Sequence, residues 1–174
     1  MQAHAHQQGI GLIEVMVAVT LLSIAVLGYG ALQLRAMHAS QQAMQNIQAM
    51  NLARDLAERM RVNRAGFGFY QSHAQTNKVC GTTSARETVQ ARSFCSAQDM
   101  AQYDMQQVSL KAQDLGMQLA VLDCPNIQLK RQCIYVAWGE TRPSNGDQPT
   151  DCTQGAAYVM RSTCIFMEAY HHAN

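Results

Sequence analysis

An uninterrupted apolar run forms the N-terminal part of the chain. From Ile10 to Leu34, a stretch of 25 residues, Glu14 is the single charged residue. As a helix this stretch would be roughly 37 Å long, more than the ~30 Å hydrocarbon core of a bilayer. A helix buried in a soluble core is the alternative, but such helices are usually shorter and keep a polar stripe. The pattern therefore predicts a helix that crosses a membrane with some tilt.

Beyond this run the pattern changes to that of an amphipathic helix. Small and apolar residues recur at spacings of three and four, at Ala36, Ala39, Ala43, Ile47, Met50, Ala53, Ala57 and Met60. No proline interrupts the chain from Ile10 to Asn63, and Asp55 and Arg59 have the spacing of an ion pair along a helix. We therefore expect one helix of roughly fifty residues, whose second half packs on a folded head.

A second helix is predicted in the middle of the chain. Gly66 and Gly68 mark the end of the first helix, and a polar, loop-like stretch follows. Apolar residues then return at helical spacing from Ala97 to Leu115. Ser96 can cap the start of this helix, and Gly116 can stop it.

The C-terminal third has the pattern of strands. Short β-rich segments run from Gln118 to Leu122, from Cys133 to Trp138 and from Ala157 to Met167. The middle one alternates Ile134, Val136 and Trp138 on one side with Tyr135 and Ala137 on the other. The stretch from Gly139 to Gly155 is rich in turn residues. We expect these strands to form an antiparallel sheet that packs on the exposed half of the long helix.

Charge and cysteine content narrow the function. The net charge of +1 offers no basic surface for a nucleic acid. All six cysteines follow the apolar run, at Cys80, Cys95, Cys124, Cys133, Cys152 and Cys164. An even count after an export-type segment indicates disulfides formed in an oxidising compartment. Zinc is the competing interpretation, but the C-x2-C and H-x3-H spacings of zinc sites are absent from the sequence.

The sequence lacks four common catalytic and nucleotide-binding motifs. There is no G-x-S-x-G, no Walker loop, no dinucleotide fingerprint and no HExxH. The cysteines are more simply bonded than nucleophilic, and the histidines have no obvious partners. We therefore expect no enzyme activity, no cofactor and no metal.

The start of the apolar run carries a specific resemblance. Gly9 is followed by Ile10, and Leu12-Ile13-Glu14 leads into the unbroken apolar helix. This arrangement resembles the class III signal of type IV pilins and pseudopilins. The resemblance implies cleavage between Gly9 and Ile10 by a prepilin peptidase and N-methylation of Ile10. It also implies that Glu14 is the carboxylate used in filament assembly.

Two further stretches are similar to the PilV group of minor pilins, residues 52–63 and residues 95–104. The resemblance implies an α+β pilin-like fold with disulfide-held loops. Its parts would be a leader peptide (1–9), the membrane-spanning and assembly half of the helix (10–34), the amphipathic half (35–63) and a periplasmic head (64–174). Six cysteines allow fifteen pairings. Our working hypothesis pairs sequence neighbours, Cys80–Cys95, Cys124–Cys133 and Cys152–Cys164.

The function implied is that of a minor pilin in the initiation or tip complex of a type IV pilus. Its partners would be other minor pilins, the major pilin, the prepilin peptidase, the inner-membrane assembly platform and, before assembly, membrane lipid. It would span the inner membrane once, with its head in the periplasm, and then enter the filament or its tip. Arg35 after the run favours the opposite orientation, but the cysteines and the leader outweigh it. A minor pseudopilin of a type II secretion system and an exported soluble binding domain with a cleavable signal remain alternatives.

Overall fold

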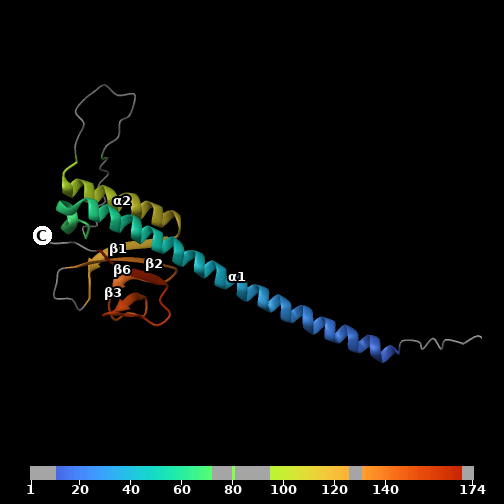
Figure 1. Ribbon diagram of the computed structural model, residues 1–174. Helices are drawn as coiled ribbons and strands as arrows, with labels where there is room; N and C mark the ends of the chain where they lie inside the picture. Colours follow the sequence, from blue (N-terminus) through green and yellow to red (C-terminus); the bar gives the residue numbers. More distant parts are fainter. Residues whose placement is uncertain (1–10, 72–79, 81–94, 126–130, 170–174) are drawn as a thin grey trace, which may run out of the picture. The chain divides into compact units, whose positions relative to one another are not determined.

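The computed structural model describes residues 11–71, 80, 95–125 and 131–169 (Figure 1). The elements are α1 (Leu12–Val62), the 3-10 helix η1 (Arg64–Phe69), α2 (Ala97–Asp114), β1 (Met117–Asp123), β2 (Gln132–Trp138), β3 (Arg142–Asn145), β4 (Asp151–Gln154), β5 (Ala157–Tyr158) and β6 (Cys164–Ala169). The chain divides into two compact units, Met1–Met44 and Gln45–Asn174, which we call the N-terminal unit and the head. The expected α+β pilin-like architecture is confirmed.

The described part of the N-terminal unit is almost entirely helical. The first turn of α1 closes when the Gly11 carbonyl accepts the N–H groups of Glu14 and Val15, at 3.0 and 3.4 Å. From here α1 continues without a break past the end of this unit. It is 51 residues long in all, as the proline-free pattern predicts. The residues of α1 in this unit are exposed, apart from the half-buried Gly30.

In the head, the last part of α1 and the whole of α2 cover one face of a three-stranded sheet (Figure 1). The two helices run antiparallel, since residues 55 and 59 of α1, and residue 63 directly after it, contact residues 111, 104 and 97 of α2. The main core is apolar and brings together Leu56, Met60, Val108, Val121 and Ile134. Full burial of a side chain such as Leu56 stabilises the fold by roughly 1.5–3 kcal/mol.

The buried stripe of α1 differs from the predicted one. It consists of Ala49, Leu52, Ala53, Leu56 and Met60. Of the predicted positions, Ile47 remains 62% exposed, and the alanines at 36, 39 and 43 lie outside the head. The prediction gave small alanines the same weight as leucines. Leu52 and Leu56 bury more apolar area, so they decide which side of the helix faces the core.

Both ends of α2 are built as its sequence predicts. The hydroxyl of Ser96 accepts the N–H of Asp99 at 3.1 Å and donates to the carboxylate of Asp99 at 2.8 Å. At the other end Gly116 has φ +68°, a conformation that glycine adopts without a Cβ penalty, and its N–H donates to the Gln113 carbonyl at 2.9 Å. The helix ends at Asp114, one residue before the predicted limit.

The main sheet has the antiparallel order β1-β2-β6. All seven residues of β2 are buried. Ile134, Val136 and Trp138 face the helical core, whereas Tyr135 and Ala137 join a second cluster on the opposite face. The alternation predicted for this strand is confirmed, and it places β2 at the centre of a layered head.

The turn-rich stretch from 139 to 155 contributes two strands, β3 and β4, to a second small sheet that the sequence pattern misses. Its order is β3-β4-β5, with β3 and β4 paired in parallel and β4 and β5 antiparallel. The head therefore has two sheets, and one of its strand pairs is parallel. A polar ring supports this sheet. The Asp151 carboxylate accepts the Ser144 hydroxyl at 2.6 Å and the Gln148 N–H at 2.9 Å, a local arrangement that hydropathy does not reveal.

The predicted strand from Ala157 to Met167 is broken into β5 and β6. Arg161, between them, has φ +67°. The chain doubles back, so that Tyr158 packs on Phe166 with ring centroids 5.2 Å apart. The Phe166 N–H also donates to the Tyr158 hydroxyl at 3.4 Å.

Three disulfides join Cys80–Cys95, Cys124–Cys133 and Cys152–Cys164, the pairing of sequence neighbours that we hypothesise. The last two lie in the second cluster, with Tyr135 and Ala137. Cys152 belongs to β4 and Cys164 to β6, so this bond connects the two sheets. All six thiols are used, and the protein has no free cysteine.

Candidate functional site

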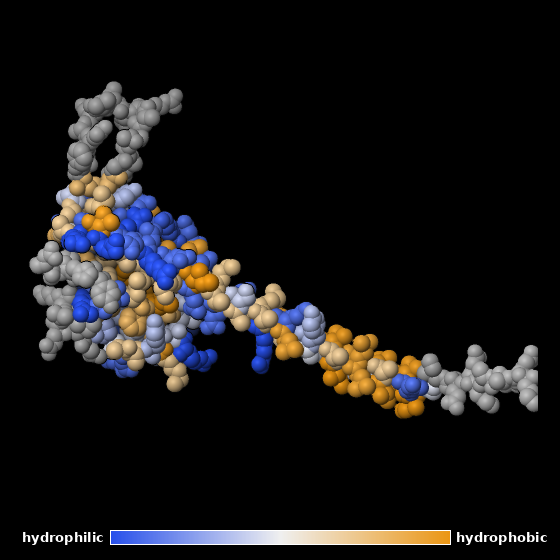
Figure 2. Space-filling model, viewed as in Figure 1, coloured by the Kyte–Doolittle hydropathy of each residue, from blue (hydrophilic) through white to orange (hydrophobic). Residues whose placement is uncertain are grey.

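The first half of α1 presents a continuous apolar surface (Figure 2). Large apolar side chains are exposed along it, including Leu12, Ile13, Leu21, Leu22, Ile24, Leu27, Leu32 and Leu34. Leu12 and Leu27 are 78% and 74% exposed. A continuous exposed apolar surface marks a contact with a membrane or with another protein. The stretch is long and apolar enough to cross a membrane, and none of it is buried within the molecule.

The two aliphatic hydroxyl groups in this stretch, those of Thr20 and Ser23, are satisfied within the helix itself, whereas the phenol of Tyr29 is exposed. Thr20 donates to the Val17 carbonyl at 2.8 Å, and Ser23 donates to the Val19 carbonyl at 2.7 Å. A hydroxyl that bonds back to its own helix needs no partner from the surroundings, which lowers the cost of placing it in lipid or among other helices. Thr20 and Ser23 thus add no unsatisfied hydroxyl group to the apolar surface.

Glu14 is the exception on this surface. It lies in the first turn of α1, where the helix dipole favours an acidic side chain. Its side chain is exposed, and no residue of the described part of the chain forms an ion pair with it. The carboxylate is therefore available to a group on another molecule. The other two predicted processing residues, Gly9 and Ile10, lie outside the described residues.

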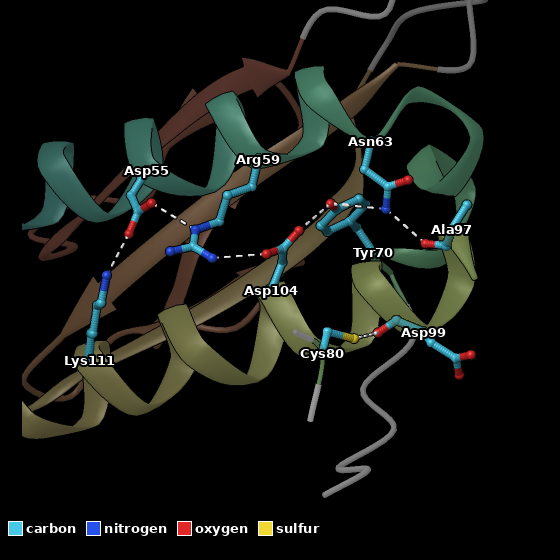
Figure 3. Close-up of polar contacts among 9 residues, drawn as sticks. All are labelled: Asp55, Arg59, Asn63, Tyr70, Cys80, Ala97, Asp99, Asp104 and Lys111. Atoms are coloured by element: carbon cyan, nitrogen blue, oxygen red, sulfur yellow. Dashed lines mark hydrogen bonds and ion pairs between the residues drawn. The ribbon is translucent and has the colours of Figure 1, made fainter. Parts of the chain in front are cut away.

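A chain of polar contacts joins α1 to α2 within the head (Figure 3). Arg59 donates through Nε to Asp55 and through Nη1 to Asp104, each at 2.8 Å. Lys111 closes the other end through a 2.9 Å contact with Asp55. The hydroxyl of the fully buried Tyr70 donates to Asp104 at 2.9 Å. Asp104, with its side chain 8% exposed, thus accepts from two donors, as a buried carboxylate requires.

The end of α1 is held by a second set of contacts (Figure 3). The Asn63 amide donates to the Ala97 carbonyl at 2.7 Å and to the Tyr70 hydroxyl at 3.4 Å. Gly66 is buried beside it, and its N–H donates to the Asn63 carbonyl at 3.1 Å. A Cβ at Gly66 would collide with the Asn63 amide and with the Ala97 carbonyl oxygen. The last turn of α1, η1 and the start of α2 therefore meet closely.

The protonation of this network is fixed near neutral pH. Burial raises the pKa of the Tyr70 hydroxyl well above its ordinary value of 10.0, and its hydrogen bond to Asp104 acts in the same direction. Desolvation alone would raise the pKa of Asp55, but hydrogen bonds from Arg59 and Lys111 outweigh it and hold the pKa below 3.8. The hydrogen bond to Asp55 raises the pKa of Arg59. Asp55 and Arg59 therefore stay charged and Tyr70 stays protonated at neutral pH, and their contacts hold the end of α1 against α2.

The sequence reveals only part of this arrangement. The spacing of Asp55 and Arg59 predicts their ion pair, and the structure confirms it. The contacts of Asp104 with Arg59 and Tyr70 join residues that are 45 and 34 positions apart in the sequence, so helical spacing does not predict them. The one available signal was Asp104 itself, an acid on the predicted apolar side of α2, between Ala101 and Val108. Among the described residues, no group of His, Cys, Asp and Glu is arranged to hold a metal ion.

Comparison with known families gives two matches. A family model described as type IV pilin Tt1218 matches residues 31–106. A model of the prokaryotic N-terminal methylation motif matches residues 4–29, which include Gly9, Ile10 and Glu14. No curated protein and no solved structure matches the chain.

Proposed function

Because the chain is a type IV pilin-like protein with an N-terminal methylation motif, we propose that it is a minor pilin in the initiation or tip complex of a type IV pilus. A pilin is a structural subunit, and we assign this chain no catalytic role. The observation that carries the proposal is the exposed apolar half of α1 with a single carboxylate, Glu14, in its first turn. The similarity of residues 52–63 and 95–104 to the PilV group supports the minor role.

Before assembly, the apolar half of α1 anchors the protein in the inner membrane. The head would lie in the periplasm, because its three disulfides require an oxidising compartment. The leader would be cut between Gly9 and Ile10 on the cytoplasmic side, and the new amine of Ile10 would be methylated. In the pilus, the apolar surface exchanges lipid for the helices of neighbouring pilins, other minor pilins and the major pilin among them.

Glu14 has a defined part in this exchange. A carboxylate near the lipid edge is tolerated but contributes nothing to anchoring. Among helices it would meet the positive N-terminal amine of a neighbouring subunit. An opposite charge is worth far more there than in water, and loss of one partner costs about 3–5 kcal/mol. The carboxylate would therefore act when a subunit leaves the bilayer and joins the filament.

The test is Glu14→Val in cells that have this variant as their only copy. We expect cleavage at Gly9 and membrane residence as in the wild type, both checked by intact mass of the membrane fraction. Pili should be several-fold fewer per cell but of normal length, because a priming subunit is needed once per filament. Glu58→Gln is the matched control, since Glu58 is an exposed acid on the same helix that pairs with Arg61.

Normal pilus numbers, with the Glu14→Val protein present in sheared filaments, would show that the carboxylate is dispensable. Pili that are shorter and not fewer would contradict the priming role. Co-purification of the wild-type protein with secretion-system components, and not with pilus components, would assign it to the pseudopilins instead. A mature chain that begins beyond Gly28 would indicate an ordinary secretory signal.

A further inference from the structure

Glu14 and Arg35 are the two charged residues in the part of α1 that runs from Leu12 to Ala53. This part contains no other Asp, Glu, Lys or Arg. Both side chains are exposed, and neither forms an ion pair within the described part of the chain. If the helix is enclosed by other helices, as the proposed function requires, each of these charges needs a partner from another subunit.

We propose that Arg35 docks the first-turn carboxylate of a neighbouring pilin helix, in a parallel packing shifted along the helix axis by the spacing between Glu14 and Arg35. This inference rests on the proposed function. It gives the first-turn carboxylate of the neighbour a second cationic partner, in addition to an N-terminal amine. A carboxylate accepts about four hydrogen bonds, so the neighbour's acid can bind Arg35 as well as an N-terminal amine. The chemistry that Arg35 recognises is an acid on an apolar helix, which this chain itself carries at Glu14.

The spacing of the two charges suits this packing. Glu14 and Arg35 are 21 residues apart, or about 31 Å along a helix. Three heptads separate them, so they lie on the same side of α1 within about 60°. The side between them carries the small residues Ala18, Ala25 and Gly28 together with Leu21 and Leu32. A Cβ placed on Gly28 would meet nothing within 4 Å, so this side is open to the close approach of a second helix.

The stretch that follows Arg35 supports the same shift. Residues 36–53 contain no Asp, Glu, Lys or Arg, and most of their side chains are exposed. A parallel neighbour shifted by 21 residues would place its own apolar run beside these residues. Their polar side chains are largely amides, such as Gln41 and Gln45, which cost less to enclose than charges. The charge-free stretch thus has the length that the apolar run of the neighbour requires.

Arg35 has a different surrounding before assembly. In a membrane-anchored subunit it lies at the end of the apolar run, where a cation meets lipid headgroups. Glu14 and Arg35 of two unshifted subunits would lie near opposite faces of the bilayer. Their pairing therefore requires one subunit to move outward by about the thickness of the hydrocarbon core.

The experiment compares Arg35→Lys, Arg35→Gln and Arg35→Glu, each as the only copy, with Arg54→Gln as the matched control. Arg54 is an exposed arginine on the same helix, just beyond the charge-free stretch. We expect near-normal pili with Arg35→Lys, about tenfold fewer with Arg35→Gln, and almost none with Arg35→Glu, because an enclosed carboxylate loses its partner or meets a like charge. Arg54→Gln should leave the count unchanged.

A cross-link tests the contact directly. Because the six native cysteines are paired, Arg35→Cys adds the one free thiol. It should form a disulfide in sheared pili with a neighbouring pilin whose first-turn acid is replaced by cysteine, when both variants are co-expressed with the wild-type proteins so that pili still assemble, whereas Arg54→Cys should not. An absent Arg35 cross-link would overturn the inference.

The outcomes separate this inference from the proposed function. If Glu14→Val lowers the pilus count while Arg35→Gln and Arg35→Glu do not, Arg35 is not a docking residue and the minor-pilin role stands. If neither Glu14→Val nor deletion of the whole protein lowers the pilus count, the proposed function itself is wrong. Loss of the Arg35→Gln protein from the membrane fraction before assembly would show that Arg35 acts only as a lipid anchor, which overturns the inference.

Discussion

At the scale of single residues, Gly66 leaves no room for a side chain. It is buried where the end of α1, η1 and the start of α2 meet. Gly66→Ala would push the new methyl group against the Asn63 amide and the Ala97 carbonyl, which is main chain and cannot move alone. We expect the free energy of unfolding to fall by about 1–3 kcal/mol.

The neighbouring Gly68 provides the control, since a Cβ there meets nothing within 4 Å. Gly68→Ala should leave the free energy of unfolding unchanged or raise it by up to about 1 kcal/mol. Guanidinium unfolding of the full chain in detergent measures both variants through the fluorescence of Trp138, the single tryptophan. If both substitutions changed the free energy of unfolding equally, the close contact at Gly66 would not be the cause of the loss.

At the scale of elements, Tyr70 ties η1 to α1 and α2 through Asp104 and Asn63. Its pKa is raised by burial, so the unfolded chain releases the hydroxyl proton first as the pH rises. The stability that this raised pKa contributes is complete below pH 10 and is lost as the pH rises above 10 towards the folded value. Tyr70→Phe should cost about 1–3 kcal/mol at neutral pH, because Asp104 loses a donor.

The test is unfolding of the wild type and Tyr70→Phe between pH 7 and pH 11. The difference in free energy of unfolding between the two proteins should narrow above pH 10, since only the wild type loses this contribution. If the free energies of unfolding of the two proteins changed with pH in parallel, folding would not raise the pKa of the Tyr70 hydroxyl.

The elements also show how far sequence reasoning reaches. The length of α1, the Ser96 cap and the alternation in β2 follow from local rules, namely helical spacing, hydrogen bonding of the first turn and strand periodicity. The second sheet was missed because its strands are short and its support comes from Asp151, a polar residue. The Arg59–Asp104–Tyr70 contacts were missed because they join distant parts of the chain, which only tertiary packing brings together. Of the candidate site, the apolar run and Glu14 could be identified from sequence because both lie in one continuous stretch.

At the scale of the whole molecule, the head is a layered structure in which Cys152–Cys164 links the two sheets. Replacing both cysteines by serine should lower the free energy of unfolding by about 2–5 kcal/mol. The second sheet should also become sensitive to proteolysis, because its short strands lose their covalent tie to β6. Both effects can be measured by guanidinium unfolding and by mapping the first cleavage sites.

Serine replacement of Cys80 and Cys95 is the comparison for this variant. Their sequence separation of 15 is close to the 12 between Cys152 and Cys164, so chain entropy alone predicts similar losses of stability. Cleavage within residues 139–163 should appear only when Cys152–Cys164 is removed. Its appearance in both variants, or in neither, would contradict the linking role.

The outer edge of β6 is partly covered by Tyr158, which bears on aggregation. β6 is an outer strand of its sheet, and an uncovered strand edge can recruit strands from other molecules into amyloid-like stacks. Here the Tyr158 hydroxyl already accepts the Phe166 N–H, and the Tyr158 ring covers Phe166 from the side. The contacts of Tyr158 thereby shield part of a strand edge that could otherwise recruit strands from other molecules.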